Sequence, residues 1–78
     1  MSESTRVTIY SKENCPKCTT AKNVSSMNGF ETNVQMLDVD YTLQDLIQMG
    51  AKREMPQVEI NGVLVGGLED FKNWLSSN

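Results

Sequence analysis

The chain has 78 residues and a formal net charge of −3, so we expect residues 1–78 to form one small domain without a linker or a repeat. This acidic balance disfavours nucleic acid or an anionic membrane as a partner, and no apolar run approaches the ~20 residues that span a bilayer. The chain contains no histidine, which excludes histidine-assisted nucleophilic catalysis and removes the commonest metal ligand.

The first half of the chain predicts a strand, a helix and a second strand. Residues 6–10 alternate and are rich in β-formers, which predicts the first strand. Pro16 suits the first turn of a helix that runs to about Met27 and ends at Gly29. We expect the apolar stripe of this helix to comprise Cys18, Ala21, Val24 and Met27. Residues 31–38 then predict the second strand.

The second half predicts a helix, a hairpin and a final helix. Thr42 is predicted to cap a helix that ends at Gly50. We expect Leu43, Leu46 and Ile47 to form the buried face of this helix. Residues 57–60 and 63–65 predict two strands, since Asn61-Gly62 between them is a strong hairpin signal. After a break at Gly66-Gly67, the inner face of the last helix is formed by Leu68, Phe71 and Leu75.

The element order is therefore β-α-β-α-β-β-α, an α/β arrangement. A right-handed parallel unit followed by an antiparallel hairpin gives a four-stranded mixed sheet with helices on both faces. This is the minimal thioredoxin-like fold.

The only two cysteines, Cys15 and Cys18, are spaced Cys-x-x-Cys at the predicted start of the first helix. The partial positive charge of a helix N-terminus lowers the pKa of a thiol, and the second thiol can resolve a mixed disulfide formed on the first. The sequence starts with no signal-peptide pattern, so we expect a cytoplasmic protein, or one of the host cytoplasm if it is viral. In that compartment the pair favours redox catalysis over a structural disulfide or a zinc half-site.

Three segments resemble glutaredoxin, and the similarity covers nearly the whole chain. Residues 9–18, Ile-Tyr-Ser-Lys-Glu-Asn-Cys-Pro-Lys-Cys, resemble the active-site segment of that family, including the lysine three residues before the first cysteine. Residues 55–58, Met-Pro-Gln-Val, resemble its loop with a cis proline. Residues 66–70, Gly-Gly-Leu-Glu-Asp, resemble the element that binds the γ-glutamyl end of glutathione.

The resemblance implies a role for each matching position. Cys15 would be the exposed nucleophile and Cys18 the buried resolving thiol. Lys12 would stabilise the Cys15 thiolate and meet the glycyl carboxylate of glutathione, and Lys17 would add positive charge beside it. The remaining glutathione-binding residues implied by the resemblance are Met55, Pro56, Gly67, Glu69 and Asp70.

The resemblance predicts a glutathione-dependent thiol–disulfide oxidoreductase that reduces protein disulfides and glutathione mixed disulfides. Glutathione would be the reductant, ribonucleotide reductase a possible acceptor, and the protein a monomer without a metal. Lys17, Glu54 and Met55 depart from the usual family residues. These departures motivate an alternative, a redoxin that is reduced by thioredoxin reductase and supplies ribonucleotide reductase. A further alternative is a dimer that binds zinc or an iron–sulfur cluster, which Pro16 after the first cysteine disfavours.

Overall fold

The structure is a computed structural model that describes residues 5–77. Seven elements follow one another along the chain: β1 (Arg6–Ser11), α1 (Pro16–Met27), β2 (Glu31–Met36), α2 (Leu43–Gln48), β3 (Gln57–Ile60), β4 (Val63–Gly66) and α3 (Leu68–Ser77). This order confirms the predicted β-α-β-α-β-β-α sequence of elements.

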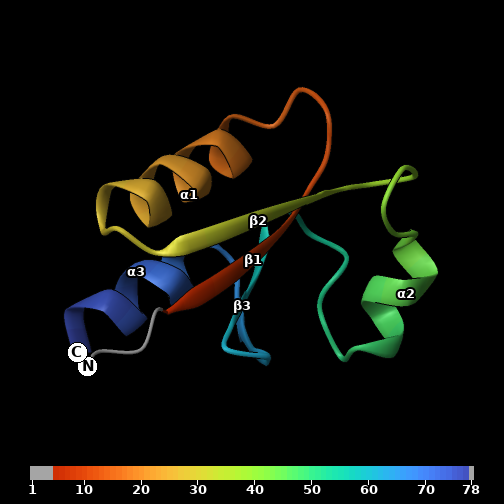
Figure 1. Ribbon diagram of the computed structural model, residues 1–78. Coiled ribbons are helices and arrows are strands. Elements are labelled where there is room, and N and C mark those ends of the chain that lie inside the picture. The colour runs from red at the N-terminus through yellow and green to blue at the C-terminus, as the bar shows by residue number, and fades with distance from the viewer. Residues whose placement is uncertain (1–4, 78) are drawn as a thin grey trace.

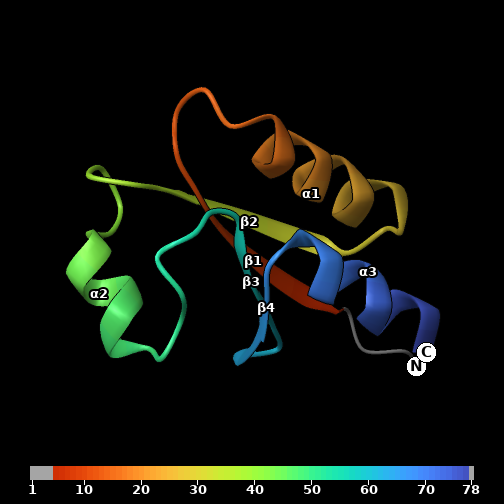
Figure 2. The same ribbon diagram turned by 180° about the vertical axis from the view of Figure 1, so that it is seen from behind.

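The four strands form one mixed sheet in the order β2-β1-β3-β4. β1 pairs with β2 in parallel and with β3 antiparallel, and β3 and β4 form the antiparallel hairpin. α1 and α3 pack against this sheet and against each other, while α2 lies apart from them on the other side of the strands (Figures 1 and 2). The predicted thioredoxin-like architecture is therefore confirmed. None of the helices within residues 5–77 is long and apolar enough to cross a membrane.

The core lies between the sheet and the pair α1 and α3. Alternate positions of β1 and β3 point into it, because successive side chains of a strand face opposite sides. Ala21 on α1 and Phe71 on α3 cover these strands, and both are fully buried. The buried cluster consists of Val7, Ile9, Ala21, Val58, Ile60 and Phe71. The core thus fixes the middle of α1 and the first turn of α3 against the same strands.

The predicted apolar stripe of α1 was wrong at its end, because Met27 is 85% exposed and Ser25 is fully buried instead. At 3.6 residues per turn, Met27 lies two and a half turns from Cys18 and so faces the opposite way. Ser25 faces the core, and its hydroxyl lies 2.6 Å from the hydroxyl of Thr32. This hydrogen bond satisfies the polar group that burial would otherwise leave unpaired.

Two further expectations also need correction. β2 ends at Met36 rather than at Asp38, because the backbone N–H groups of Val39 and Asp40 both donate to the Met36 carbonyl and turn the chain. Leu43 is 38% exposed, whereas Leu46 is fully buried. A helix of six residues has fewer than two turns, so α2 buries one position completely rather than a face.

Candidate functional site

Cys15 is the N-cap residue of α1, and Cys18 lies one turn further on. The two form a disulfide, in which Cys15 is half-buried and Cys18 is 5% exposed. The Cys18 backbone N–H donates to the Cys15 Sγ atom over 3.2 Å. In the reduced protein this donor and the helix N-terminus both favour a negative charge on Cys15. The geometry therefore gives Cys15 the accessible sulfur and Cys18 the buried one.

The loop before β3 passes directly beside this sulfur. The Cys15 Sγ atom lies 3.9 Å from the Met55 carbonyl oxygen, and the Met55-Pro56 peptide bond is cis, as predicted. Directly after Pro56, the buried Gln57 side chain donates through Nε2 to the Glu54 carbonyl over 2.8 Å. The sequence pattern predicts Gln57 only as a strand residue. A polar residue at the first position of a predicted strand, directly after a loop proline, is the signal that could have marked it as a loop anchor.

The start of α3 forms the far wall of the site. The Gly67 backbone N–H donates to the Asp70 carboxylate over 3.1 Å, and the Phe71 N–H donates to the Gly67 carbonyl over 2.9 Å. The first N–H groups of a helix have no intrahelical partner, so this end of α3 offers donors to an anion. Gly66 precedes it with φ +130°, a conformation that side chains with a Cβ rarely adopt.

We expect Gly66→Ala to lower the free energy of unfolding by about 1–3 kcal/mol, because the residue would keep a positive φ. Its Cβ would also collide with the Asp70 carboxylate and displace it from the Gly67 N–H. Gly67→Ala is the matched control, since a Cβ there meets only the Pro56 carbonyl oxygen at an ordinary 3.6 Å. Chemical denaturation of both variants measures the difference. Equal losses in the two variants would contradict this account.

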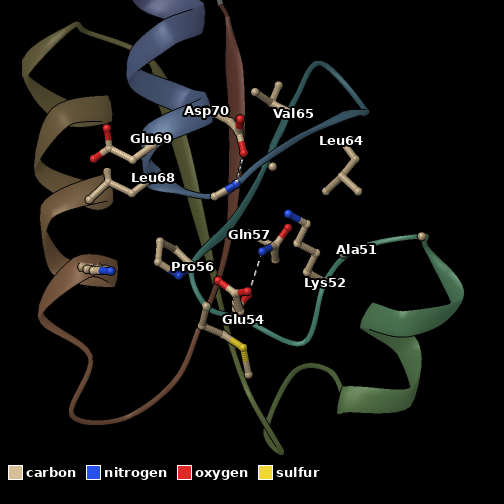
Figure 3. Close-up of a pocket in the computed structure, with 15 residues that line it drawn as sticks. Ala51, Lys52, Glu54, Pro56, Gln57, Leu64, Val65, Leu68, Glu69 and Asp70 are labelled. Atoms are coloured by element: carbon tan, nitrogen blue, oxygen red, sulfur yellow. Dashed lines mark hydrogen bonds between the residues drawn. The ribbon is translucent and has the colours of Figure 1, made fainter.

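The loop, β4 and α3 enclose an open groove of about 390 Å³, which we call the β4-side groove (Figure 3). Six of the seven predicted glutathione-binding residues line it: Lys17, Met55, Pro56, Gly67, Glu69 and Asp70. Lys52 also lines this groove, opposite the start of α3. Lys12 does not line it, and instead borders a second cavity together with both cysteines. The site residues predicted from sequence thus fall on two sides of the disulfide.

A buried tyrosine holds the end of β1, from which the loop to Cys15 departs. The Tyr41 hydroxyl donates to the Ser11 carbonyl over 2.8 Å, and the Leu37 backbone N–H donates to the same oxygen over 2.9 Å. The ring of Tyr41 packs edge-on against Tyr10 with centroids 5.1 Å apart. Burial, followed by the charge of Asp38 and the neighbouring Tyr10, raises the pKa of Tyr41 to about 12. Tyr41 therefore stays a hydrogen-bond donor throughout the neutral range.

This pKa predicts how stability depends on alkaline pH. The pKa of Tyr41 is higher in the folded protein than in the unfolded chain. The contribution of Tyr41 to the free energy of unfolding is therefore complete below about pH 10 and is lost as the pH rises through about 12. We expect Tyr41→Phe to lower the free energy of unfolding by about 0.5–1.5 kcal/mol at neutral pH. The same variant should show a weaker decline of stability at alkaline pH. Denaturation of the wild type and of Tyr41→Phe across that pH range tests both effects. An unchanged alkaline slope in Tyr41→Phe would contradict the assignment.

Within residues 5–77, no group of three or more histidine, cysteine, aspartate or glutamate side chains could hold a metal ion. The only cysteines of the chain are already paired with each other. The site is therefore an assembly of a redox-active pair, a backbone-lined groove and a helix N-terminus.

Comparison with known proteins agrees with this geometry. A sequence model of the glutaredoxin family matches residues 7–65. The chain is 34% identical over 68 residues to the mitochondrial glutaredoxin-2 of Bos taurus, covering 82% of this chain but 43% of the bovine protein. It is 33% identical over 68 residues to glutaredoxin 3 of Escherichia coli, covering 83% of this chain and 80% of that protein.

Solved structures show the same fold. The oxidized glutaredoxin 2 of Chlamydomonas reinhardtii superposes with a TM-score of 0.66 at 35% identity, covering 94% of this chain and 73% of that one. A buckwheat glutaredoxin–glutathione complex superposes with a TM-score of 0.81 at 23% identity, covering 91% and 68% of the two chains. With its Cys-x-x-Cys pair, its cis-proline loop and a family match over most of its length, the chain belongs to the glutaredoxin family.

Proposed function

We propose that this protein is a glutathione-dependent thiol–disulfide oxidoreductase that reduces protein disulfides and glutathione mixed disulfides. The observation that carries the proposal is the position of Cys15, whose sulfur is accessible at the N-terminus of α1 and 3.9 Å from the Met55 carbonyl oxygen. Membership of the glutaredoxin family supports the thiol–disulfide chemistry.

For a glutathione mixed disulfide, the Cys15 thiolate attacks the glutathionyl sulfur. A Cys15–glutathione disulfide forms, the substrate disulfide breaks, and the substrate leaves as a thiolate. A second glutathione thiolate then attacks the glutathionyl sulfur, which releases glutathione disulfide and restores the Cys15 thiolate. For a protein disulfide, Cys18 resolves the mixed species instead, and the Cys15–Cys18 disulfide of the present structure results.

The β4-side groove supports glutathione as the reductant. Its Met55 backbone can pair with the cysteinyl part of the tripeptide, and the start of α3 can receive the γ-glutamyl carboxylate. The Asp70 carboxylate lies where it can accept from the γ-glutamyl ammonium group. The relative from buckwheat is described in a complex with glutathione, which agrees with this use of the fold.

The first test is reduction of a cysteine–glutathione mixed disulfide by the wild-type protein, with NADPH consumption followed through glutathione reductase. We expect turnover that depends on both the protein and glutathione. A parallel reaction replaces glutathione and its reductase by thioredoxin reductase. Turnover only in that second reaction would contradict the proposal and favour a thioredoxin-reductase-linked redoxin.

We expect Asp70→Asn to raise the KM for the mixed disulfide roughly ten-fold with little change in kcat, because one charge-assisted contact is lost. Asparagine retains an oxygen that can accept from the Gly67 N–H, so α3 keeps its cap. Glu31→Gln is the matched control, since Glu31 pairs with Arg6 on β1 and lines neither site cavity. A similar KM change in both variants would contradict a specific role for Asp70.

A further inference from the structure

The disulfide has a second opening, which the glutathione assignment does not use. It is a cavity of about 550 Å³ bordered by the end of β1, the first turns of α1 and the strand β2, and we call it the β2-side groove. Because β2 and β4 lie at opposite edges of the sheet, this groove and the β4-side groove approach the active site from opposite sides. Both cysteines line the β2-side groove, whereas neither lines the β4-side groove.

The β2-side groove is cationic. Lys12 and Lys22 border it against one carboxylate, Glu13. Both lysines are exposed, and neither takes part in the ion pairs found within residues 5–77, which join Arg6 to Glu31 and Lys72 to Glu69. The β4-side groove has the opposite balance, with two lysines against three carboxylates. The chain as a whole has a net charge of −3, so the excess of positive charge around this groove differs from the rest of the protein.

The floor of the β2-side groove is partly apolar. Val34 and Met36 of β2 line it and are half-buried. Val34 pairs in register with Ile9, which places both on the sheet face that α1 covers. Lys22 lies one helical turn after Cys18 on α1, so the two share a face of the helix. A chain segment in this groove would therefore meet apolar side chains below and two ammonium groups at its rim.

We propose that the β2-side groove docks an acidic segment with apolar residues, located beside the disulfide of a protein substrate. This rests on the proposed oxidoreductase function and specifies its protein substrate class. The charges of Lys12 and Lys22 increase the rate of encounter with such a segment, because opposite charges steer association and like charges suppress it. Val34 and Met36 then add contact area to the docked complex. In the proposed function glutathione lies in the β4-side groove, so reduction of small mixed disulfides should not depend on Lys22, Val34 or Met36.

The test uses two synthetic peptides of equal length, each with one internal disulfide. One peptide has Glu and Leu residues beside its cysteines, and the other has Lys and Leu. Pre-reduced protein is mixed with each peptide, and the single-turnover rate constant is measured by acid quench. In this reaction the protein dithiol becomes the Cys15–Cys18 disulfide and the peptide disulfide becomes a dithiol, so no glutathione is needed. The outcome of this test therefore does not depend on whether the protein is active in the glutathione-coupled assay.

We expect wild-type protein to reduce the acidic peptide about ten-fold faster at low salt, within the range that electrostatic steering produces. Lys22→Glu should remove most of this preference, Lys22→Arg should keep it, and high salt should diminish it. Lys72→Glu makes the same change in net charge on α3 and should leave the preference unchanged. The KM for the cysteine–glutathione mixed disulfide should be the same in Lys22→Glu and wild type.

Two results would overturn the proposal. One is equal rates for the acidic and basic peptides with the wild-type protein at low salt. The other is an equal loss of preference in Lys22→Glu and Lys72→Glu, which would show an effect of net charge rather than of the β2-side groove. Failure of the glutathione-coupled assay with a retained peptide preference would contradict only the choice of reductant.

Discussion

Cys15→Ser is expected to lose all reduction of glutathione mixed disulfides, a fall of roughly 10³-fold or more to the uncatalysed background. A serine hydroxyl at this position has no base to activate it, since the chain contains no histidine. Cys18 cannot readily replace Cys15, because the Cys18 residue is only 5% exposed whereas Cys15 is half-buried. Cys15, at the N-cap of α1, is therefore the group expected to attack the mixed disulfide.

Cys18→Ser separates the two halves of the reaction. This variant retains Cys15 and its place at the N-terminus of α1, so we expect mixed disulfides of glutathione to be reduced at a rate near that of the wild type. Reduction of a protein disulfide should fall strongly, because the mixed species on Cys15 loses its resolving thiol. The same coupled assay measures both substrates. Retained activity in Cys15→Ser together with loss in Cys18→Ser would reverse the two roles.

Sequence patterns were sufficient for the elements whose signals are local. The hairpin at Asn61-Gly62 forms as predicted, since both residues adopt the positive φ that such a turn requires. Thr42 caps α2, and its partner Asp45 closes the reciprocal capping box. The start of α1 at Pro16 likewise agrees with the rule for proline in a first helical turn. Each of these signals lies within a few residues of the feature that it specifies.

Features that depend on distant partners were not predicted. Ser25 is buried because Thr32, on another element, supplies its hydrogen bond, and no local pattern contains that pairing. Lys12 and Lys22 come together only because α1 packs beside β2. Most residues of the site could therefore be predicted from the sequence, whereas the places of Gln57, Lys22 and Lys52 and the division of the site between two grooves depend on the fold.

Phe71→Ala is expected to have the largest effect on stability, lowering the free energy of unfolding by about 3–5 kcal/mol. Phe71 is fully buried and is the largest of the fully buried side chains. The free energy of unfolding of such domains is about 5–15 kcal/mol in total, so the variant would be marginally folded. Val63→Ala is the control, because Val63 is 66% exposed and its truncation should change stability by less than about 0.5 kcal/mol. Denaturation of the oxidised proteins measures both.

The milder Phe71→Leu variant connects this core position to the site. Phe71 holds the first turn of α3, and its backbone N–H donates to the Gly67 carbonyl at the wall of the β4-side groove. Looser packing there should displace the α3 donors from the groove while leaving Cys15 at the start of α1 unchanged. We therefore expect the KM for the glutathione mixed disulfide to rise more than kcat falls. A fall of kcat with an unchanged KM would contradict this expectation. It would place the effect of Phe71 on the Cys15 side of the protein, through the contact between α3 and α1.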